Sequence, residues 1–144
     1  MRLTDALGTT VLSRDDAEEL GRVRHLVVDV GSRRISAVHI DGRRKKALLV
    51  DWDALSGFGP DAVVVGPGDA LRGPADDTEL AMVAGDLDWI GRRVLTDQGN
   101  DVGSVTDIEF DPASGALTAV VTEQGAHDAE RLRALGPYCV VVRA

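Results

Sequence analysis

The chain contains an internal repeat. The stretch ELGRVRHLVVDVGSRRISAV, which begins at Glu19, resembles DVGSVTDIEFDPASGALTAV, which begins at Asp101. A fixed period of this kind is the sequence signature of a repeated structural unit. The 144 residues are therefore predicted to fold as two copies of one unit. The matching positions all share one constant offset and are Gly21 with Gly103, Val23 with Val105, Leu26 with Ile108, Val28 with Phe110, Asp29 with Asp111, Ile35 with Leu117, and Ala37 with Ala119.

The repeat extends in both directions beyond these stretches. Upstream, LGTTVLS from Leu7 matches IGRRVLT from Ile90, at an offset one position longer than that of the central match. Downstream, GPDAVVV from Gly59 matches GPYCVVV from Gly136, at a slightly shorter offset. Each unit is thus roughly sixty residues long, and two such units account for nearly the whole chain.

Within each unit the apolar residues alternate with polar ones, which predicts short, half-buried β-strands. The alternation slips by one residue between Val23 and Leu26, and the second unit repeats the slip between Val105 and Ile108. A slip of this kind predicts a β-bulge or a sharp bend. The glycine that lies just before each slip would let the backbone turn tightly or lie close to a neighbouring strand.

Turn residues mark the ends of the strands. Asp29 and Asp111 each close a long strand and open a turn, because an Asp side chain can accept a hydrogen bond from its own downstream amide. After the returning strand of the first unit, the Asp-Gly pair at 41–42 predicts a two-residue hairpin that leads into a strand over 43–51. The corresponding stretch of the second unit, EQGAHDAERLRAL, is polar, and residues 127–135 indicate one or two helical turns. The second unit is therefore predicted to be abbreviated.

A Gly- and Pro-rich linker joins the two units and leads into a helix that begins near Asp76 or Asp77. We expect this helix to pack against both halves. The predicted organisation is a first repeat over 1–72, a linker with a short helix over 73–86, and a second repeat over 87–144. The fold class is mainly β.

The charge of the chain is acidic and unevenly placed. The formal net charge is -8, which argues against a general nucleic-acid binder because phosphate contacts come from clustered Lys and Arg. Residues 1–72 carry eleven basic and eleven acidic side chains, whereas residues 73–144 carry five basic and thirteen acidic ones. The second half therefore holds the whole net charge.

One basic run stands out in the neutral first half. The run comprises Arg43, Arg44, Lys45 and Lys46. It could form a patch for phosphate or for an acidic protein surface, or it could simply keep the edge of a hairpin soluble. Single-strand binding is disfavoured, because aromatic residues make up only 3% of the chain and bases would have little to stack on.

The sequence lacks the motifs of common catalytic and cofactor sites. It has no Gly-x-Ser-x-Gly elbow, no Walker loop and no dinucleotide fingerprint. His25, His39 and His127 have no metal-ligand spacing with the single cysteine, so surface or partly buried positions explain them. We therefore expect no catalytic residues, no metal and no cofactor. Trp52 and Trp89 are predicted to be anchors of the core or of the contact between the units.

The stretch ELGRVRHLVVD, followed by a turn and ISAV, resembles the PRC-barrel module, and both copies carry the pattern. The family is named from the photosynthetic reaction centre H subunit and includes a domain similar to the carboxy-terminal domain of the ribosome maturation factor RimM. The tandem arrangement resembles short actinobacterial PRC-barrel proteins. The resemblance implies two tandem six-stranded antiparallel β-barrels, related by a pseudo-two-fold repeat, with one or two short helices. It also implies a role in macromolecular interaction and no catalytic residues.

The leading hypothesis is a non-enzymatic adaptor that binds a protein partner or a second copy of itself. In a homodimer, the basic run of one chain could dock on the acidic second half of its neighbour. The alternative is a ribosome or RNA-processing accessory that would use the same four cations on RNA. No apolar run approaches the roughly 20 residues of a membrane-spanning helix, and the amino terminus has no apolar signal region, so we expect a cytoplasmic protein.

Overall fold

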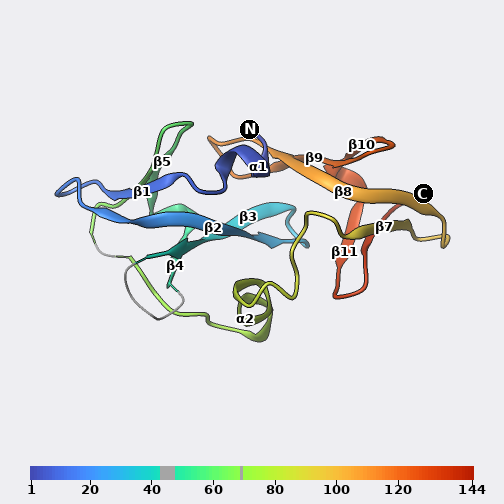
Figure 1. Cartoon of the computed structure of the whole chain (residues 1–144), viewed down its shortest axis with the longest axis horizontal. Coiled ribbons are helices and arrows are strands. Elements are labelled where there is room, and N and C mark those ends of the chain that lie inside the picture. The colour runs from blue at the N-terminus through green and yellow to red at the C-terminus, as the bar shows by residue number, and fades with distance from the viewer. Residues whose placement is uncertain (43–47, 69) are drawn as a thin grey trace.

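The computed structural model describes the whole chain except residues 43–47 and 69. It contains two six-stranded sheets, which Figure 1 shows side by side along the long axis of the molecule. We call the first sheet, with helix α1 (Leu3–Ala6), the first module, and the second sheet the second module. The first sheet has the order β4-β3-β2-β1-β6-β5 and comprises β1 (Thr10–Ser13), β2 (Glu19–Asp29), β3 (Arg34–Asp41), β4 (Leu48–Asp51), β5 (Leu55–Phe58) and β6 (Val63–Val65).

The second sheet has the equivalent order, β10-β9-β8-β7-β12-β11. A 3-10 turn joins the fourth strand of each module to the fifth: η1 (Trp52–Ala54) in the first and η2 (Ala129–Arg131) in the second. Helix α2 (Asp77–Val83) lies between the modules in sequence. The strands of the second sheet are β7 (Arg93–Thr96), β8 (Asp101–Phe110), β9 (Leu117–Thr122), β10 (Gly125–Asp128), β11 (Leu132–Leu135) and β12 (Val140–Val142).

Strand pairing confirms the repeat residue by residue. Val11 pairs with Val63 in the first module, and their sequence equivalents Val94 and Val140 pair in the second, so the upstream and downstream matches are structural. The predicted bulge is also confirmed, because the register between the second and third strands shifts just after Val23 and again just after its equivalent in β8. The same irregularity at the same place in both modules shows that the bulge belongs to the repeating unit.

Gly21 shows why that position lacks a side chain. Its φ is 147°, and a Cβ there would lie 2.4 Å from the carbonyl oxygen of Asp41 on the neighbouring strand. No other residue fits such a close approach without moving the backbone. The glycine before the bulge therefore sets how closely β2 and β3 pack.

The implied antiparallel barrel is corrected in two respects. Each sheet is mixed, because β1 pairs with β6 in parallel and β7 pairs with β12 in parallel. Each sheet is also open, since among the described residues the terminal strands β4 and β5 share no ladder of hydrogen bonds, nor do β10 and β11. Only a single 3-10 turn of three residues separates the two terminal strands in each module, and a connection of this kind is not a hairpin turn that pairs the strands it joins.

The predicted two-residue hairpin at 41–42 is wrong. Ile40 pairs with Leu48, so the connection between β3 and β4 is longer than two residues. Gly42 has a different role from a turn residue, because a Cβ on it would lie 2.6 Å from the carbonyl oxygen of Leu20. The glycine permits a close approach to β2. An Asp-Gly pair can mark either a tight hairpin turn or such a close approach, and the sequence pattern is the same in both cases.

The second module is not abbreviated. Residues 125–128, for which the sequence predicts no strand, form β10 and pair with β9, and residues 132–135 form β11. Of the predicted helical turns, only the single 3-10 turn η2 is present. The burial pattern explains the error: Gly125, Ala126 and Asp128 are exposed, so β10 has no apolar face that would mark it as a strand.

Helix α2 confirms the predicted helix. Asp76 caps it, and its side chain accepts a hydrogen bond from the amide of Glu79. Met82 packs with Val27 and Ala37 of the first module, and Leu135 of the second module lies against the same cluster. The helix therefore packs on the first module, and the cluster that it joins also includes a residue of the second module; the expected packing of the helix itself against both halves stays a prediction. No helix among the described residues is long and apolar enough to cross a membrane.

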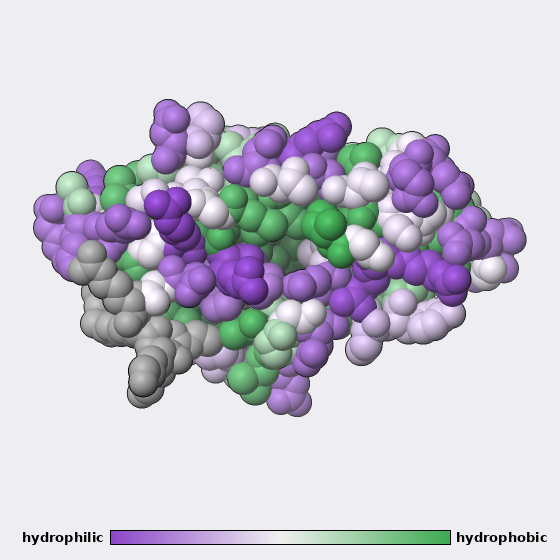
Figure 2. Space-filling model, viewed as in Figure 1, coloured by the Kyte–Doolittle hydropathy of each residue, from purple (hydrophilic) through white to green (hydrophobic). Residues whose placement is uncertain are grey.

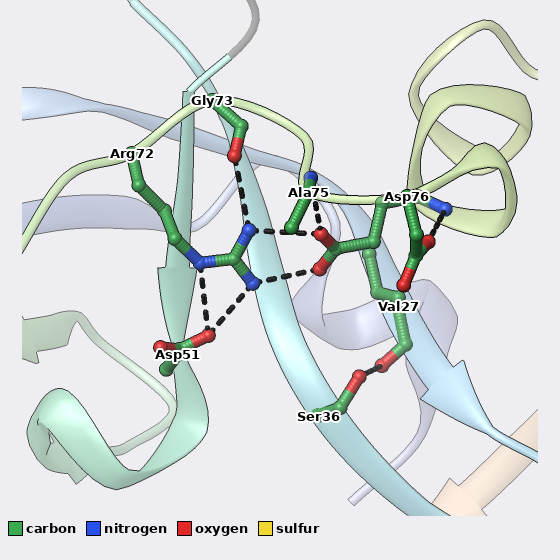
Figure 3. A network of polar contacts seen from close by, with 8 residues as sticks. Val27, Ser36, Asp51, Arg72, Gly73, Ala75 and Asp76 are labelled. Atoms are coloured by element: carbon green, nitrogen blue, oxygen red, sulfur yellow. Dashed lines mark hydrogen bonds and ion pairs between the residues drawn. The ribbon is translucent and has the colours of Figure 1, made fainter.

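A single arginine fastens the linker and α2 to the first module (Figure 3). The guanidinium of Arg72 donates to Oδ1 of Asp51 at 2.7 and 3.1 Å, and to the two carboxylate oxygens of Glu79 at 2.7 and 2.8 Å. The amide of Ala75 also donates to Glu79, at 2.8 Å. These hydrogen bonds hold the pKa of the largely buried Glu79 carboxyl below its usual range. We call this network the Arg72 clasp.

One hydrophobic core runs through both modules. Phe58 of the first module meets Phe110 of the second edge to face, with ring centroids 5.6 Å apart. Trp52 stacks on Phe58, and its ring lies so close to Gly115 of the second module that a Cβ there would approach to 2.9 Å. Trp89 is buried in the same core. Both tryptophans are therefore anchors of the core and of the contact between modules, as predicted.

Candidate interaction site at the seam between the modules

The two modules meet across a pseudo-two-fold axis. The amide of Ile35 donates to the carbonyl of Gly115 at 2.8 Å, and the amide of Leu117 donates to the carbonyl of Arg33 at 2.9 Å. Ile35 and Leu117 are equivalent in the repeat, as are Arg33 and Gly115, so each bond is the counterpart of the other. This reciprocal pairing is the geometry of an isologous dimer contact, here made within one chain.

On one side of this axis, α1 covers the second module. The main-chain amide of Thr4 donates to Oδ1 of Asp107 at 3.2 Å, and the Thr4 hydroxyl donates to the other carboxylate oxygen. Arg2 pairs with Glu109 at 3.0 Å. Asp107 is buried, but its oxygens are used by these contacts and by the amide of Ile108. These contacts fasten the amino-terminal helix to β8 of the second module.

The segment 86–90 lies over β2 of the first module, where Asp88 meets His25, and together with residues of α1 it borders a hollow of about 170 Å³. We call it the seam hollow. Most of its lining is apolar, and it includes Leu3, Leu26, Met82 and Trp89. Figure 2 shows apolar residues gathered around a hollow near the middle of the visible face.

Two exposed aliphatic side chains belong to the lining of the seam hollow. Leu7 is 38% exposed and Ile90 is 44% exposed. They are equivalent in the repeat, so the pseudo-two-fold relation brings one such residue from each module to the seam. Large apolar side chains gathered at the edge of a hollow are typical of binding surfaces.

A chain of hydrogen bonds borders the seam hollow. Nε2 of His25 lies 3.1 Å from Oδ1 of Asp88, and Nδ1 of His25 lies 2.8 Å from Nδ1 of His39. The two imidazole rings are nearly parallel, with an interplanar angle of 7° and centroids 5.1 Å apart, as an edge-to-edge hydrogen bond between ring nitrogens requires. Two facing ring nitrogens form a hydrogen bond only when one carries the proton and the other does not, so both rings cannot be fully protonated in this arrangement.

Burial sets the proton affinity of this pair. Burial lowers the pKa of His25, although the Asp88 carboxylate opposes that effect. Burial also lowers the pKa of His39, and the neighbouring His25 lowers it further. Near neutral pH the pair is thus held in its uncharged form, because desolvation disfavours imidazolium.

Two donors beside the seam hollow have no acceptor among the residues that the structure describes. The indole Nε1 of Trp89 is buried without a hydrogen bond. Arg24 is exposed, and within the described part of the chain no hydrogen bond or ion pair to its guanidinium is present. The exposed guanidinium of Arg24 is therefore available to an incoming oxygen acceptor, whereas the indole nitrogen of Trp89 is closed off from solvent.

The chemical groups at the seam hollow are few. Asp88 and His25 could hold or move a proton, and within the described residues no Ser, Thr or Cys side chain bonds to either imidazole of the pair. The described residues also contain no group of three or more His, Cys, Asp or Glu that could hold a metal ion.

The predicted site residues lie in different parts of the molecule. Arg43, Arg44, Lys45 and Lys46 lie outside the described residues. The apolar residues of the repeat signature are buried in the core, and one of them, Leu26, also lines the seam hollow. The two aspartates of the signature each accept a hydrogen bond from a downstream amide and so open a turn. The buried residues are Val23, Leu26, Val105 and Ile108, and the aspartates are Asp29 and Asp111. The signature is therefore mainly a framework for the fold.

Sequence reasoning misses the two histidines as a pair. It interprets them as separate surface or partly buried residues, whereas β2 and β3 place them directly opposite each other. The signal that could have found them is the register of this hairpin, which pairs His25 with His39 once the two bulges are counted.

The family follows from comparison of the whole chain with known domains. The PRC-barrel domain model matches it twice, over residues 1–71 and over residues 85–141. The chain belongs to the PRC-barrel family. Its two matched segments coincide with the two modules, so each six-stranded sheet is one PRC-barrel domain. A search of curated proteins found no match to the chain.

Proposed function

We propose that this tandem PRC-barrel protein is a non-enzymatic adaptor whose seam hollow accepts one apolar side chain of a protein partner. The observation that carries the proposal is the pair of exposed equivalent residues, Leu7 and Ile90, which line an apolar hollow between two otherwise tightly packed modules. Small β-modules of this family supply the scaffold. The pseudo-two-fold seam makes the hollow, so it requires both modules in one chain.

The size of the hollow selects the occupant. An apolar cavity of about 150 Å³ holds a benzene-sized group. The seam hollow, at about 170 Å³, therefore fits a single aliphatic or aromatic side chain rather than a large cofactor. Burying such a side chain stabilises a complex by about 1.5–3 kcal/mol, which is enough to make it the anchor of a modest interface.

The charge of the chain favours a protein partner over RNA. The second half carries thirteen acidic and five basic side chains, so the field around that module repels phosphate and attracts a basic protein surface. The border of the hollow itself is mixed, since Arg24 and Asp88 both line it. An anchor side chain flanked by basic residues is the partner chemistry that best fits this surface.

The test is affinity recovery of the tagged protein from its host with and without nuclease, followed by direct titration of the recovered partner. The test variant is Ile90→Asp, and the matched control is Leu80→Asp, which changes another exposed aliphatic residue, on α2. We expect a nuclease-resistant partner that binds wild type and L80D equally and binds I90D at least about tenfold more weakly. Equal loss in both variants, or recovery of ribosomal RNA only, would reject the seam hollow as the binding surface.

A direct probe removes the dependence on an unknown partner. The chain has two tryptophans, so in a Trp52→Phe background Trp89 alone reports on the hollow by fluorescence. Benzene should change the Trp89 emission in a saturable way, and filling the hollow from within by Leu26→Phe should abolish the change. An unsaturable response, or the same response in the filled variant, would show that the hollow does not admit an apolar group.

A further inference from the structure

Among the described residues, the outer edge of the fourth strand is covered in the first module and uncovered in the second. In the first module, the linker pairs with β4: the amide of Leu49 donates to the carbonyl of Arg72 at 2.7 Å, and the amide of Arg72 donates back to the carbonyl of Leu49 at 2.8 Å. This isolated antiparallel bridge covers the edge of the sheet. The side chain of Leu49 is fully buried in the cluster with Val27, Ala37 and Met82.

In the second module, the equivalent edge is bare. Ala126 of β10 corresponds to Leu49 of β4, by the same relation that matches the downstream parts of the repeat. Ala126 pairs with Val121 as Leu49 pairs with His39, so the register directs the main-chain amide and carbonyl of Ala126 away from β9. No strand or bridge among the described residues lies on that edge, and Ala126 is exposed.

The carboxylate that lies beside the covered edge of β4 also has an equivalent beside the bare edge of β10. In the first module, Arg72 pairs with Leu49 through its backbone and reaches Asp51 through its guanidinium. Asp128 is the equivalent of Asp51, two residues beyond Ala126 on the same face of the strand. Asp128 is exposed, and its carboxylate has no hydrogen bond or ion pair among the described residues.

We propose that the free edge of β10 binds an extended segment of a protein partner, with an arginine of that segment pairing with Ala126 through its backbone and with Asp128 through its side chain. In the first module, the chain's own linker binds the equivalent edge in this way. Two main-chain hydrogen bonds hold the linker against β4, and one Arg-carboxylate pair makes the contact specific for arginine. The acidic excess of the second half favours a basic segment. This surface is separate from the seam hollow and does not depend on it, because no residue of β10 lines the hollow.

The affinity of one short segment is expected to be low. The Arg72 clasp uses two carboxylates, Asp51 and the largely buried Glu79, whereas within the described residues no counterpart of Glu79 accompanies β10. An exposed ion pair contributes only about 0.2–1 kcal/mol, so the arginine should change binding by at most about fivefold. A basic edge-binding segment would thus add to another contact rather than replace it.

The test uses the full chain and the linker's own sequence as the probe. A peptide with the sequence of residues 70–75, ALRGPA, acetylated and amidated, is titrated into ¹⁵N-labelled protein, and ALAGPA is the control peptide. We expect saturable shifts centred on the amides of residues 125–128 and slower hydrogen exchange at Ala126. Binding of ALRGPA should weaken by at most about fivefold in Asp128→Asn, and that variant should bind both peptides equally.

Two further variants separate the proposed contact from general effects. Asp61→Asn removes an equivalent charge from an exposed turn of the first module and should leave binding unchanged. Ala126→Pro removes the outward amide without removing a ladder bond and should abolish binding, and Ile90→Asp should not affect it. Three results would overturn the proposal: shifts centred elsewhere, equal binding of both peptides to wild type, or β10 shifts that depend only on protein concentration and so reveal pairing with a second copy.

Discussion

The two modules share strand order, register and bulge, yet their surroundings differ. The first module has a covered outer edge, where the Arg72 clasp holds the linker against β4, and a seam side where segment 86–90 leaves a hollow. The second module differs: α1 is bonded to β8 through Thr4 and Asp107, and among the described residues β10 has a bare edge. The repeat thus gives the same strand scaffold twice, and the segments that pack around each sheet differ and leave different surfaces open.

The largest expected effect comes from breaking the core that makes the two modules one unit. Phe110 is buried against Phe58 of the other module, so Phe110→Ala should lower the free energy of unfolding by about 3–5 kcal/mol. Urea unfolding followed by circular dichroism and by tryptophan fluorescence should give one coincident transition in wild type. Two separate transitions in wild type would contradict a shared core and would make the modules independent domains.

The next largest effect is the loss of stability expected when the Arg72 clasp at the covered edge is broken. Arg72→Ala leaves the largely buried Glu79 carboxylate without its partner, so it should lower the free energy of unfolding by about 1–3 kcal/mol. Hydrogen exchange should also become faster at the amide of Leu49, whose acceptor lies in the same linker. In Arg72→Ala/Glu79→Leu much of the lost stability should return, since the uncompensated charge is gone. No change in either variant would mean that the clasp contributes nothing to the fold.

A smaller effect is the pH dependence of stability that comes from the histidine pair beside the seam hollow. His25 and His39 have lowered pKa values when folded, so the unfolded chain binds more protons as the pH falls below the ordinary histidine pKa near 6.5. Their contribution to stability is therefore complete above that pH and declines as the pH falls from 7 toward 5. Urea unfolding at several pH values measures the slope.

The repeat supplies a matched variant for this pH test. His39→Val introduces the residue found at the equivalent position, Val121, and should flatten the slope between pH 7 and pH 5. His127→Asn is the control, because His127 also has a lowered pKa but lies away from the seam hollow. If removal of His127 flattened the slope as much as removal of His39, the seam pair would not be its source.

The smallest effect belongs to the bare edge. Asp128 has no partner among the described residues, so Asp128→Asn should change the free energy of unfolding by less than about 0.5 kcal/mol. Its equivalent, Asp51, contributes to the Arg72 clasp, and Asp51→Asn should destabilise the chain more than Asp128→Asn does. Thermal and urea unfolding of the two variants side by side would check this, and equal losses would contradict the assignment of one edge as occupied and the other as free.

Much of the fold could be predicted because it is encoded in local patterns. The alternation of apolar residues within each unit, the slip after Val23 and the cap at Asp76 each depend on residues close in sequence. The strand β10 could not be predicted in this way, because an exposed edge strand needs no apolar face and pairs through its backbone. The prediction of a two-residue turn at 41–42 was wrong for a related reason: the glycine there permits a close contact with Leu20 across the sheet.

By itself the sequence determined that there are two copies of one PRC-barrel unit, where each bulges, and where the helix between them begins, since periodicity and capping act over a few residues. Tertiary structure alone decided that each sheet stays open, that His25 meets Asp88, and that Arg72 covers one edge while Ala126 stays bare. These contacts join residues far apart in the chain. Which of them form depends on how the two modules pack around their pseudo-two-fold axis, a long-range arrangement that no short stretch of sequence specifies.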